Sequence, residues 1–179
     1  MPTKRQSKTI PTKQEAIAGI QTAMRFLNIP TDGDYSDTPA RYLAAMSEIL
    51  TPLPFEATKF LTPSGRRAGR LVVAQKGIEF RCVCAHHLFP FWGSADVAYL
   101  PSSHVEGRSV LGLSKLSRIV SFWAAWAPQM QERLTAQIAD DIIKHADARG
   151  VFVVTHAEHG CMKFRGPKQA AVTVVSVAV

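Results

Sequence analysis

The order of apolar patterns along the 179-residue chain restricts its fold more than any other feature. Two runs with helical spacing come first, β-rich runs follow, and two more helical runs then precede a last pair of β-rich runs. The helical runs begin at Thr12, Thr38, Ser114 and Pro128, and the β-rich runs span residues 71–74, 78–83, 95–100, 151–155 and 171–179. Because helices and strands are grouped rather than alternating, the pattern predicts an α+β fold with a largely antiparallel sheet and helices packed on one face.

Local signals mark the ends of these helical runs. Thr12 with Glu15 three residues later forms a capping box, and Thr38 followed by Pro39 is a typical cap and first turn. Arg149–Gly150 predicts the end of the last helix. We expect one structural domain in three parts, namely a flexible basic arm over residues 1–11, a helical segment and loop over 12–70, and a sheet-containing region over 71–179.

Composition excludes several classes of protein. A chain of this length with 46% hydrophobic residues can bury a full core, but its longest uncharged runs, 119–131 and 169–179, fall short of the roughly 18 to 20 apolar residues of a membrane span. The charged first residues argue against an export signal, and three cysteines fit a reduced, cytoplasmic compartment better than a disulfide framework. The net charge of +7 predicts an anionic ligand. A phosphorylated small molecule explains it as well as nucleic acid would, and no nucleic-acid-binding module is recognisable.

Cysteines and histidines gather in two short segments. Cys84 and His87 form a C-x-x-H pair, which by itself supplies half of a tetrahedral zinc site. The segment alone is explained equally well as a strand with a buried cysteine followed by surface histidines. His159 and Cys161 share one face if their segment is a strand. With Cys84, His87 and Cys161 as ligands, Zn²⁺ would keep an open position, which is the catalytic pattern. Cys82 as a fourth ligand would instead close the site.

Two further segments carry polar side chains that suit a nucleotide. Residues 112–118 form a glycine-containing turn that opens a helix, where Lys115 and Arg118 could hold phosphate groups. The alternative is a capped helix with a solvated basic face. Gln131 and Glu132 could meet the edge of a guanine base, because a carboxylate can accept two N–H bonds; surface polarity is the simpler explanation.

The histidines next to the expected ligands could transfer protons. His86 and His159 would lie close to the metal without binding it, and histidine titrates near working pH. For His86, simple exposure to solvent explains the residue equally well.

Taken together, these segments resemble GTP cyclohydrolase I. The family's C-E-H-H corresponds to Cys84–His87, its G-L-S-K-x-x-R-I-V to residues 112–120, its P-Q-x-Q-E-R-L-T to 128–135, its H-x-C-M-x-x-R-G to 159–166 and its T-P-x-R to 38–41. The motifs follow in the same order from about Lys13 to the last residue. The resemblance implies a tunnelling fold, with the catalytic region over residues 71–179, and subunits that assemble into a homodecamer of two stacked rings with active sites between subunits.

The implied reaction is hydrolysis of GTP to 7,8-dihydroneopterin triphosphate with release of formate, which would supply a folate, biopterin or deazapurine pathway. The resemblance makes Cys84, His87 and Cys161 the ligands of Zn²⁺, which activates the water that attacks C8 of the purine. It also gives roles in proton transfer and rearrangement to His86, His159 and Ser114. For substrate binding it implies Lys115, Arg118, Arg165 and a neighbouring subunit's Arg41 at the triphosphate, and Gln131 and Glu132 at the guanine.

The chain departs from the family pattern at several positions. Ala85 stands where the family has glutamate, and Ala127 stands where an arginine often precedes Pro-Gln. The segment after Gly166 also differs from the usual Thr/Ser-rich strand and tail. Two alternatives follow: an enzyme of the same fold that acts on another purine nucleotide such as dGTP or stops at an early product, and a non-catalytic zinc- and nucleotide-binding assembly protein. The presence of both His86 and His159 argues against the second.

Overall fold

The computed structural model describes residues 10–61, 71–101, 109–169 and 172–179. The expected basic arm therefore lies almost entirely outside the described residues, and so does residue 70, the expected boundary of the sheet-containing region. Residues 1–48 and 49–179 form two compact units. The boundaries expected from the sequence remain predictions.

The first unit is helical. It contains α1 (Lys13–Phe26), a short 3-10 helix η1 (Gly33–Tyr35) and α2 (Thr38–Ile49). The capping box at the start of α1 is confirmed, because the Thr12 hydroxyl accepts the Glu15 amide at 3.2 Å while the Glu15 carboxylate accepts the Thr12 amide at 2.7 Å. The expected start of α2 at Thr38 is confirmed as well.

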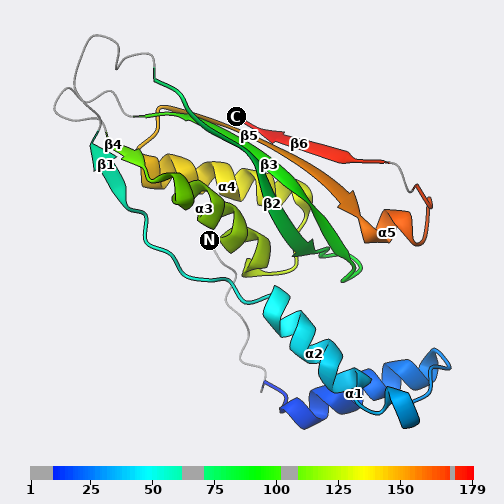
Figure 1. Cartoon of the computed structure of the whole chain (residues 1–179). Coiled ribbons are helices and arrows are strands. Elements are labelled where there is room, and N and C mark those ends of the chain that lie inside the picture. Colours follow the sequence, from blue (N-terminus) through cyan, green and yellow to red (C-terminus); the bar gives the residue numbers. More distant parts are fainter. Residues whose placement is uncertain (1–9, 62–70, 102–108, 170–171) are drawn as a thin grey trace. The chain divides into compact units, whose positions relative to one another are not determined.

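The second unit is an antiparallel sheet with helices on one face (Figure 1). The four-stranded sheet has the order β2 (Val73–Val83), β3 (Pro90–Leu100), β5 (Gly150–His159), β6 (Val174–Ala178), and a two-stranded sheet pairs β1 (Lys59–Leu61) with β4 (Ser109–Leu111). The helices are α3 (Leu113–Trp126), α4 (Gln131–Ala146) and the single turn α5 (Gly160–Lys163). All strand pairs are antiparallel, so the expected α+β fold is confirmed.

The apolar spacing of α4 explains how the helical layer packs. Leu134, Ile138 and Ile142 recur at helical spacing and are fully buried. They form the core together with inward residues of β3 such as Phe91 and Val97. The helical layer and the sheet therefore share one core. Burial stabilises the fold by roughly 1.5–3 kcal/mol for each large apolar side chain.

The β-rich runs expected at 71–74, 78–83 and 95–100 left Gly77 and Gly93 outside any strand, which is wrong for both glycines. Gly77 does not end a strand; its φ of +67° lies at a register shift between Gln75 and Ile78 that keeps β2 continuous. Gly93 lies inside β3, because a Cβ there would come within 1.8 Å of the His156 carbonyl oxygen on β5. Gly77 permits a bulge and Gly93 permits a close approach of two strands, whereas from the sequence pattern both glycines were expected to interrupt a strand.

Two predicted helix starts were also displaced. Gly112 rather than Ser114 precedes the first residue of α3, and α4 begins at Gln131 rather than Pro128. Residues 128–130 instead form a connection that pairs with the end of β2 through a bridge between Cys84 and Gln129.

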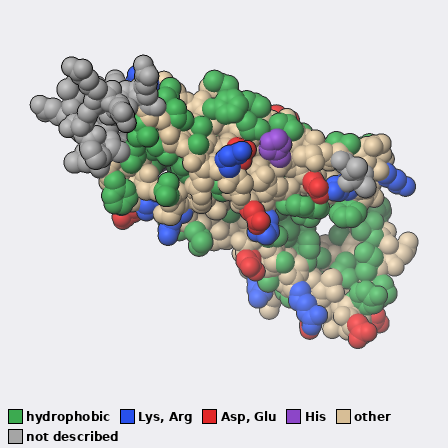
Figure 2. Space-filling view, turned by 45° about the horizontal axis from the view of Figure 1, so that its top comes forward, with side chains coloured by type: hydrophobic (Ala, Val, Ile, Leu, Met, Phe, Trp, Pro, Cys, Tyr) green, Lys and Arg blue, Asp and Glu red, His purple; other side chains and the backbone are tan. Residues whose placement is uncertain are grey.

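The described helices include none long and apolar enough to cross a membrane. On the face drawn in Figure 2, lysine and arginine side chains of the described residues are interspersed with aspartate and glutamate. This face therefore carries no continuous basic patch among those residues.

Candidate functional site

The turn after β2 is held in place by backbone hydrogen bonds on both sides. The Cys84 amide donates to the Phe89 carbonyl at 2.8 Å, which closes the turn onto the start of β3. The Ala85 amide donates to the Gln129 carbonyl at 2.9 Å, and the Gln129 amide donates to the Val83 carbonyl at 2.7 Å. The position of Cys84 is thus fixed by the connection between α3 and α4.

A second turn brings the other cysteine to the same place. His159 is the last residue of β5, and Cys161 follows in the single turn of α5. Between them, Gly160 passes so close to β3 that a Cβ would lie 2.8 Å from the Pro90 carbonyl oxygen. A residue without a side chain is therefore what lets Cys161 reach Cys84.

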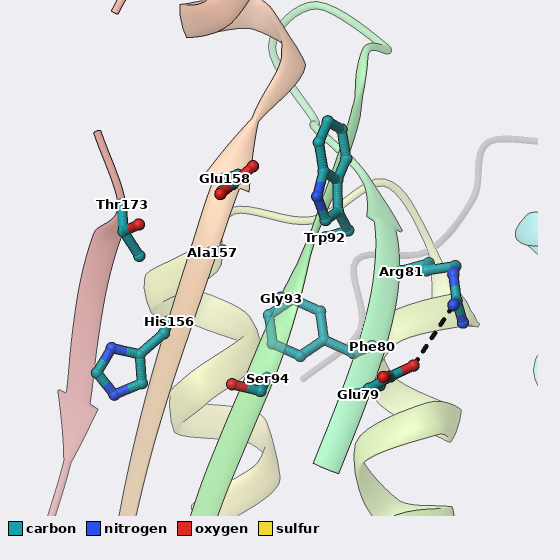
Figure 3. A pocket seen from close by; sticks show the side chains of 10 residues that line it. All are labelled: Glu79, Phe80, Arg81, Trp92, Gly93, Ser94, His156, Ala157, Glu158 and Thr173. Atoms are coloured by element: carbon teal, nitrogen blue, oxygen red, sulfur yellow. Dashed lines mark hydrogen bonds and ion pairs between the residues drawn. The ribbon is translucent and has the colours of Figure 1, made fainter. Parts of the chain in front are cut away.

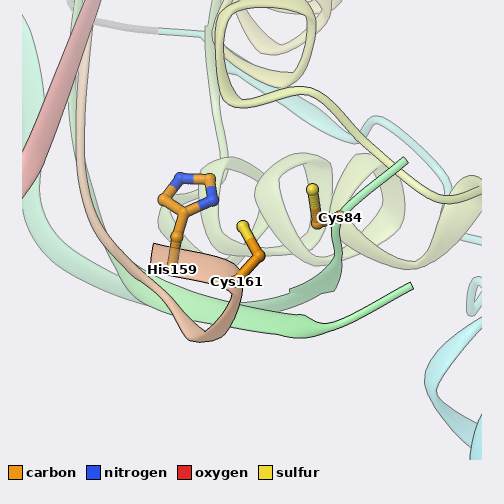
Figure 4. Close-up of side chains that lie close together, drawn as sticks. All are labelled: Cys84, His159 and Cys161. Carbon is orange, nitrogen blue, oxygen red and sulfur yellow. The ribbon is translucent and has the colours of Figure 1, made fainter. Parts of the chain in front are cut away.

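The two turns create a group of possible metal ligands. One ligand atom from each of Cys84, His159 and Cys161 lies within 4.8 Å of the others (Figure 4). In a tetrahedral zinc site with Zn–S bonds of about 2.3 Å, neighbouring ligand atoms are about 3.8 Å apart. Small side-chain movements would close the difference, so the donor set fits a zinc ion.

The electrostatics of the cysteines agree with this. Burial raises the pKa of the Cys161 thiol, the neighbouring Cys84 sulfur raises it further, and Arg165 acts in the opposite direction. The Cys161 thiol therefore resists losing its proton unless a cation lies beside it. A metal ion would supply that charge, since zinc binds the thiolate form.

The expected ligand His87 lies beside this group and not within it. Its Nδ1 is 4.0 Å from the Cys84 sulfur, but it does not belong to the described residues whose ligand atoms all lie within 4.8 Å of one another. The side chains of His86 and His87 are both exposed, with ring centroids 6.2 Å apart. The structure thus brings His159 closer to both sulfurs than the sequence suggested.

Cys82 offers no fourth ligand. It is buried opposite Phe91 in the sheet, outside the ligand group. Burial raises the pKa of its thiol to about 12. A neutral thiol packed in the core is a poor metal ligand, so the closed-site alternative has no support among the described residues.

The imidazole of His159 is fixed on two sides. Its Nε2 lies 2.9 Å from Oε1 of Gln131, and its ring stacks on Phe91 with centroids 4.5 Å apart and planes at 3°. Burial lowers the pKa of His159, while the Glu132 carboxylate opposes that shift. The stacking partner could not be predicted from the sequence, because Phe91 falls between the runs 78–83 and 95–100 that were expected to form strands.

The expected phosphate-binding residues line a cavity of their own. Lys115 and Arg118 border a space of about 450 Å³ together with Phe55 and Glu56. Ser114 is exposed nearby, in the first turn of α3. The other lining residues, Pro54, Phe55 and Glu56, precede β1 and carry no sequence signal that would have identified them.

Two other expected phosphate ligands lie elsewhere. Arg165 is exposed just after α5 and is close enough to influence Cys161. Arg41 is in α2 of the first unit, where its guanidinium pairs with Asp37 at 3.2 Å.

Within one chain, the cation-lined cavity and the sulfur ligands are at opposite ends of α3. Lys115 is in its first turn, whereas Gln129, bonded through its side chain to the Trp123 carbonyl at 2.8 Å, joins its last turn to Cys84. A helix of 14 residues is about 20 Å long. Figure 1 shows the same separation, with β1 and β4 near one end of α3 and the end of β2 near the other.

The uncovered face of the sheet carries a second cavity of about 400 Å³ (Figure 3). Trp92 lines it with two carboxylates. Glu79 pairs with Arg81 at 3.4 Å, and Glu158 pairs with Lys163 at 2.5 Å. Since both carboxylates are neutralised within the chain, the cavity presents no unbalanced acidic charge for selecting a ligand.

An antiparallel sheet backed by helices, with a thiol–imidazole group at one end, defines an α+β protein with a site suited to a metal. A family model described as GTP cyclohydrolase I matches residues 18–179, and the chain belongs to this family. Ala85 and Ala127 are thus variations within it.

Relatives of known name agree with the family model. The GTP cyclohydrolase 1 of Leifsonia xyli subsp. xyli is 44% identical over 152 residues, covering 83% of this chain and 76% of the relative. The GTP cyclohydrolase 1 of Mycolicibacterium vanbaalenii is 42% identical over 176 residues, covering 95% of this chain and 85% of the relative. Among solved structures, the apo archaeosine synthase QueF-Like aligns with a TM-score of 0.47 and 17% identity over 65% of this chain and 93% of that one.

Proposed function

We propose that this GTP cyclohydrolase uses Zn²⁺ to hydrolyse GTP at C8 of the purine, opens the ring, releases formate and forms 7,8-dihydroneopterin triphosphate. Membership in the family supports GTP as the substrate. The observation that carries the proposal is the pair of thiols Cys84 and Cys161, whose sulfur atoms lie within 4.8 Å of each other, with Nδ1 of His87 4.0 Å from the Cys84 sulfur. Thiolate and imidazole are the ligands that zinc prefers.

Cys84, Cys161 and His87 are the metal ligands in this proposal. The exposed side chain of His87 can turn toward the two sulfurs, one of which lies 4.0 Å from its Nδ1. His159, held by a hydrogen bond and a stacked ring, is left to transfer protons. When bound, Zn²⁺ would supply Lewis-acid activation of a water molecule by lowering its pKa to about 7.

The charged residues bind the triphosphate. Lys115 and Arg118 border the same cavity, and two convergent cations suit a polyphosphate. Arg165 would contact the phosphate chain from the side of Cys161, and Arg41 would do so from a neighbouring subunit.

The base and its protons are handled by residues around α4 and the Cys84 turn. Glu132, exposed in the first turn of α4, accepts N–H groups of guanine. His86 exchanges the N7 proton during ring opening, and His159 serves the later transfers. Ser114 assists opening of the ribose and the rearrangement.

We also propose that each site combines residues from more than one copy of the chain. The sulfur ligands lie beside the last turn of α3, whereas Lys115 and Arg118 lie in its first two turns, about 16 and 12 Å along the axis from its last residue. We infer that Lys115 and Arg118 of a neighbouring subunit complete each site, in keeping with a ring-stacked homodecamer.

Turnover and zinc content test the chemistry. Reduced, zinc-loaded protein is incubated with GTP while formate release and pterin fluorescence after oxidation are followed. Formate and pterin together support the proposal. Formate alone means that ring opening occurs without rearrangement, and neither product from zinc-loaded protein overturns GTP as the substrate, so that dGTP becomes the next compound to test.

A matched pair of variants tests the ligand assignment. His87→Ala should lose bound zinc, whereas His159→Ala should keep zinc and lose turnover. The opposite result, with zinc lost only from His159→Ala, would make His159 the third ligand and overturn the assignment of His87.

Mixed assemblies test the shared site. A Cys161→Ser variant and a Lys115→Ala/Arg118→Ala variant should each be inactive alone. If ligands and cations come from different copies, exchange of subunits between the two restores some turnover, because certain sites then combine two intact halves. A mixture that stays inactive after verified subunit exchange would show that each chain supplies both halves.

A further inference from the structure

Gln131 is buried at the first position of α4, where the resemblance placed it at the guanine. Its side chain is only 2% exposed, and its Nε2 faces three acceptors. These are the Thr155 carbonyl at 3.0 Å, the Thr155 hydroxyl at 3.1 Å and the Val174 carbonyl at 3.0 Å. The chain itself therefore uses the donors of this amide.

A chain of buried hydroxyls determines the direction of these bonds. The Thr135 hydroxyl donates to the Gln131 carbonyl at 2.8 Å, so it must accept the proton of Thr155, whose hydroxyl lies 2.7 Å away. Having donated its single proton, the Thr155 hydroxyl can only accept from Gln131. A flipped amide would set Oε1 against two carbonyls and this hydroxyl, so Nε2 faces β5 and β6 and Oε1 faces His159.

The orientation of the amide determines the tautomer of His159. Oε1 of Gln131 is an acceptor, so the imidazole nitrogen 2.9 Å from it, Nε2, carries a hydrogen. In the neutral ring the other nitrogen, Nδ1, then has none. Stacking on Phe91 fixes the ring plane, and in Figure 4 the second ring nitrogen faces the sulfurs of Cys84 and Cys161.

We propose that Gln131 is a positioning residue that holds His159 as the Nε2–H tautomer and so directs an unprotonated Nδ1 at the two cysteines. Gln131 then acts through His159 rather than on the base. The consequence for turnover rests on the proposed function, because a nitrogen that accepts a proton from the substrate needs its lone pair directed at the site. The tautomer itself follows from the hydrogen bonds alone.

Nitrogen-15 NMR of the metal-free, reduced full-length chain tests the tautomer directly. In protein labelled at histidine, we expect Nε2–H for His159, and in Gln131→Met we expect a mixture or the Nδ1–H form. An Nδ1–H ring in the unaltered chain, or an unchanged Nε2–H ring in folded Gln131→Met, would overturn the proposal.

A matched control separates this effect from general disturbance of the core. Gln129 is equally buried and its amide donates to Trp123 and Gln137, with no contact to His159. Gln129→Met should therefore leave the tautomer of His159 unchanged. A tautomer shift of the same size in Gln129→Met would attribute the effect to loosened packing and overturn the role of Gln131.

Kinetics provide a second readout. Loss of a residue that orients a functional histidine should lower kcat by about 10- to 100-fold while KM for GTP changes little, whereas loss of a base contact would raise KM. A raised KM with unchanged kcat would return Gln131 to the guanine. If the unaltered enzyme does not turn over GTP, the proposed function fails, while the NMR result still decides the tautomer.

Discussion

Replacing Thr155 with valine would remove the hydroxyl at the centre of the buried network without changing the volume of the side chain greatly. The change deletes two hydrogen bonds, with Thr135 at 2.7 Å and with the Gln131 amide at 3.1 Å. Both partners keep other bonds, since Thr135 still donates to the Gln131 carbonyl and the amide still faces two carbonyls. At about 0.5–1.5 kcal/mol for each lost bond, we expect the free energy of unfolding to fall by about 1–3 kcal/mol.

The measurement is urea denaturation of the metal-free, reduced chain at fixed protein concentration, followed by circular dichroism. Thermal unfolding should agree, with a decrease in Tm of about 2–4 °C for each kcal/mol. Thr173→Val is a matched control, because Thr173 is exposed and its change should stay within about 0.5 kcal/mol. If Thr155→Val is as stable as the unaltered chain, the hydroxyl network contributes nothing and the reasoning from it is refuted.

Three other changes have defined outcomes. Gly93→Ala places a Cβ within 1.8 Å of the His156 carbonyl oxygen and should separate β3 from β5, lowering Tm sharply; a Tm equal to that of the unaltered chain would show that the strands move apart at no cost. The Cys82 thiol, with its pKa raised to about 12, binds a proton in the folded chain that the unfolded chain loses above its ordinary value of 9.0, so stability should fall as pH rises past 9 by up to about 1.4 kcal/mol per unit. Cys82→Ala should flatten that slope in denaturation curves taken between pH 8 and 10, and identical slopes would contradict the assignment. Glu132→Ala should weaken the preference for guanine over adenine nucleotides in competition assays, and an unaltered preference would place base recognition elsewhere.

Much of the architecture could be predicted because it depends on local signals. The capping box of Thr12 and Glu15 and the buried stripe of α4 are both set by residues within a few positions of one another. The course of the strands at two glycines could not be predicted, since Gly77 acts through its positive φ at a register shift against β3 and Gly93 through its close approach to β5. From the sequence alone, a glycine that permits a bulge or a close approach between strands cannot be distinguished from a glycine that ends a strand.

The candidate site shows the same division. That Cys84 and Cys161 lie close together could be predicted from the sequence, because thiols near histidines are typical ligands of a single metal ion. The direction of the Gln131 amide could not, since it depends on Thr155 and Val174, each distant in the chain. Motif spacing marks Gln131 as polar and near the site, and only the buried hydrogen bonds show which way it faces.

The length of α3 has a consequence for how the enzyme responds to dilution. If the sulfur ligands and the phosphate-binding cations of each site belong to different copies, an isolated chain can hold its metal but cannot complete a site. Specific activity would then fall as the protein is diluted below the dissociation constant of its assembly, while the zinc content of each chain stays constant. The amount of active enzyme would depend on the total concentration of the chain more steeply than in direct proportion.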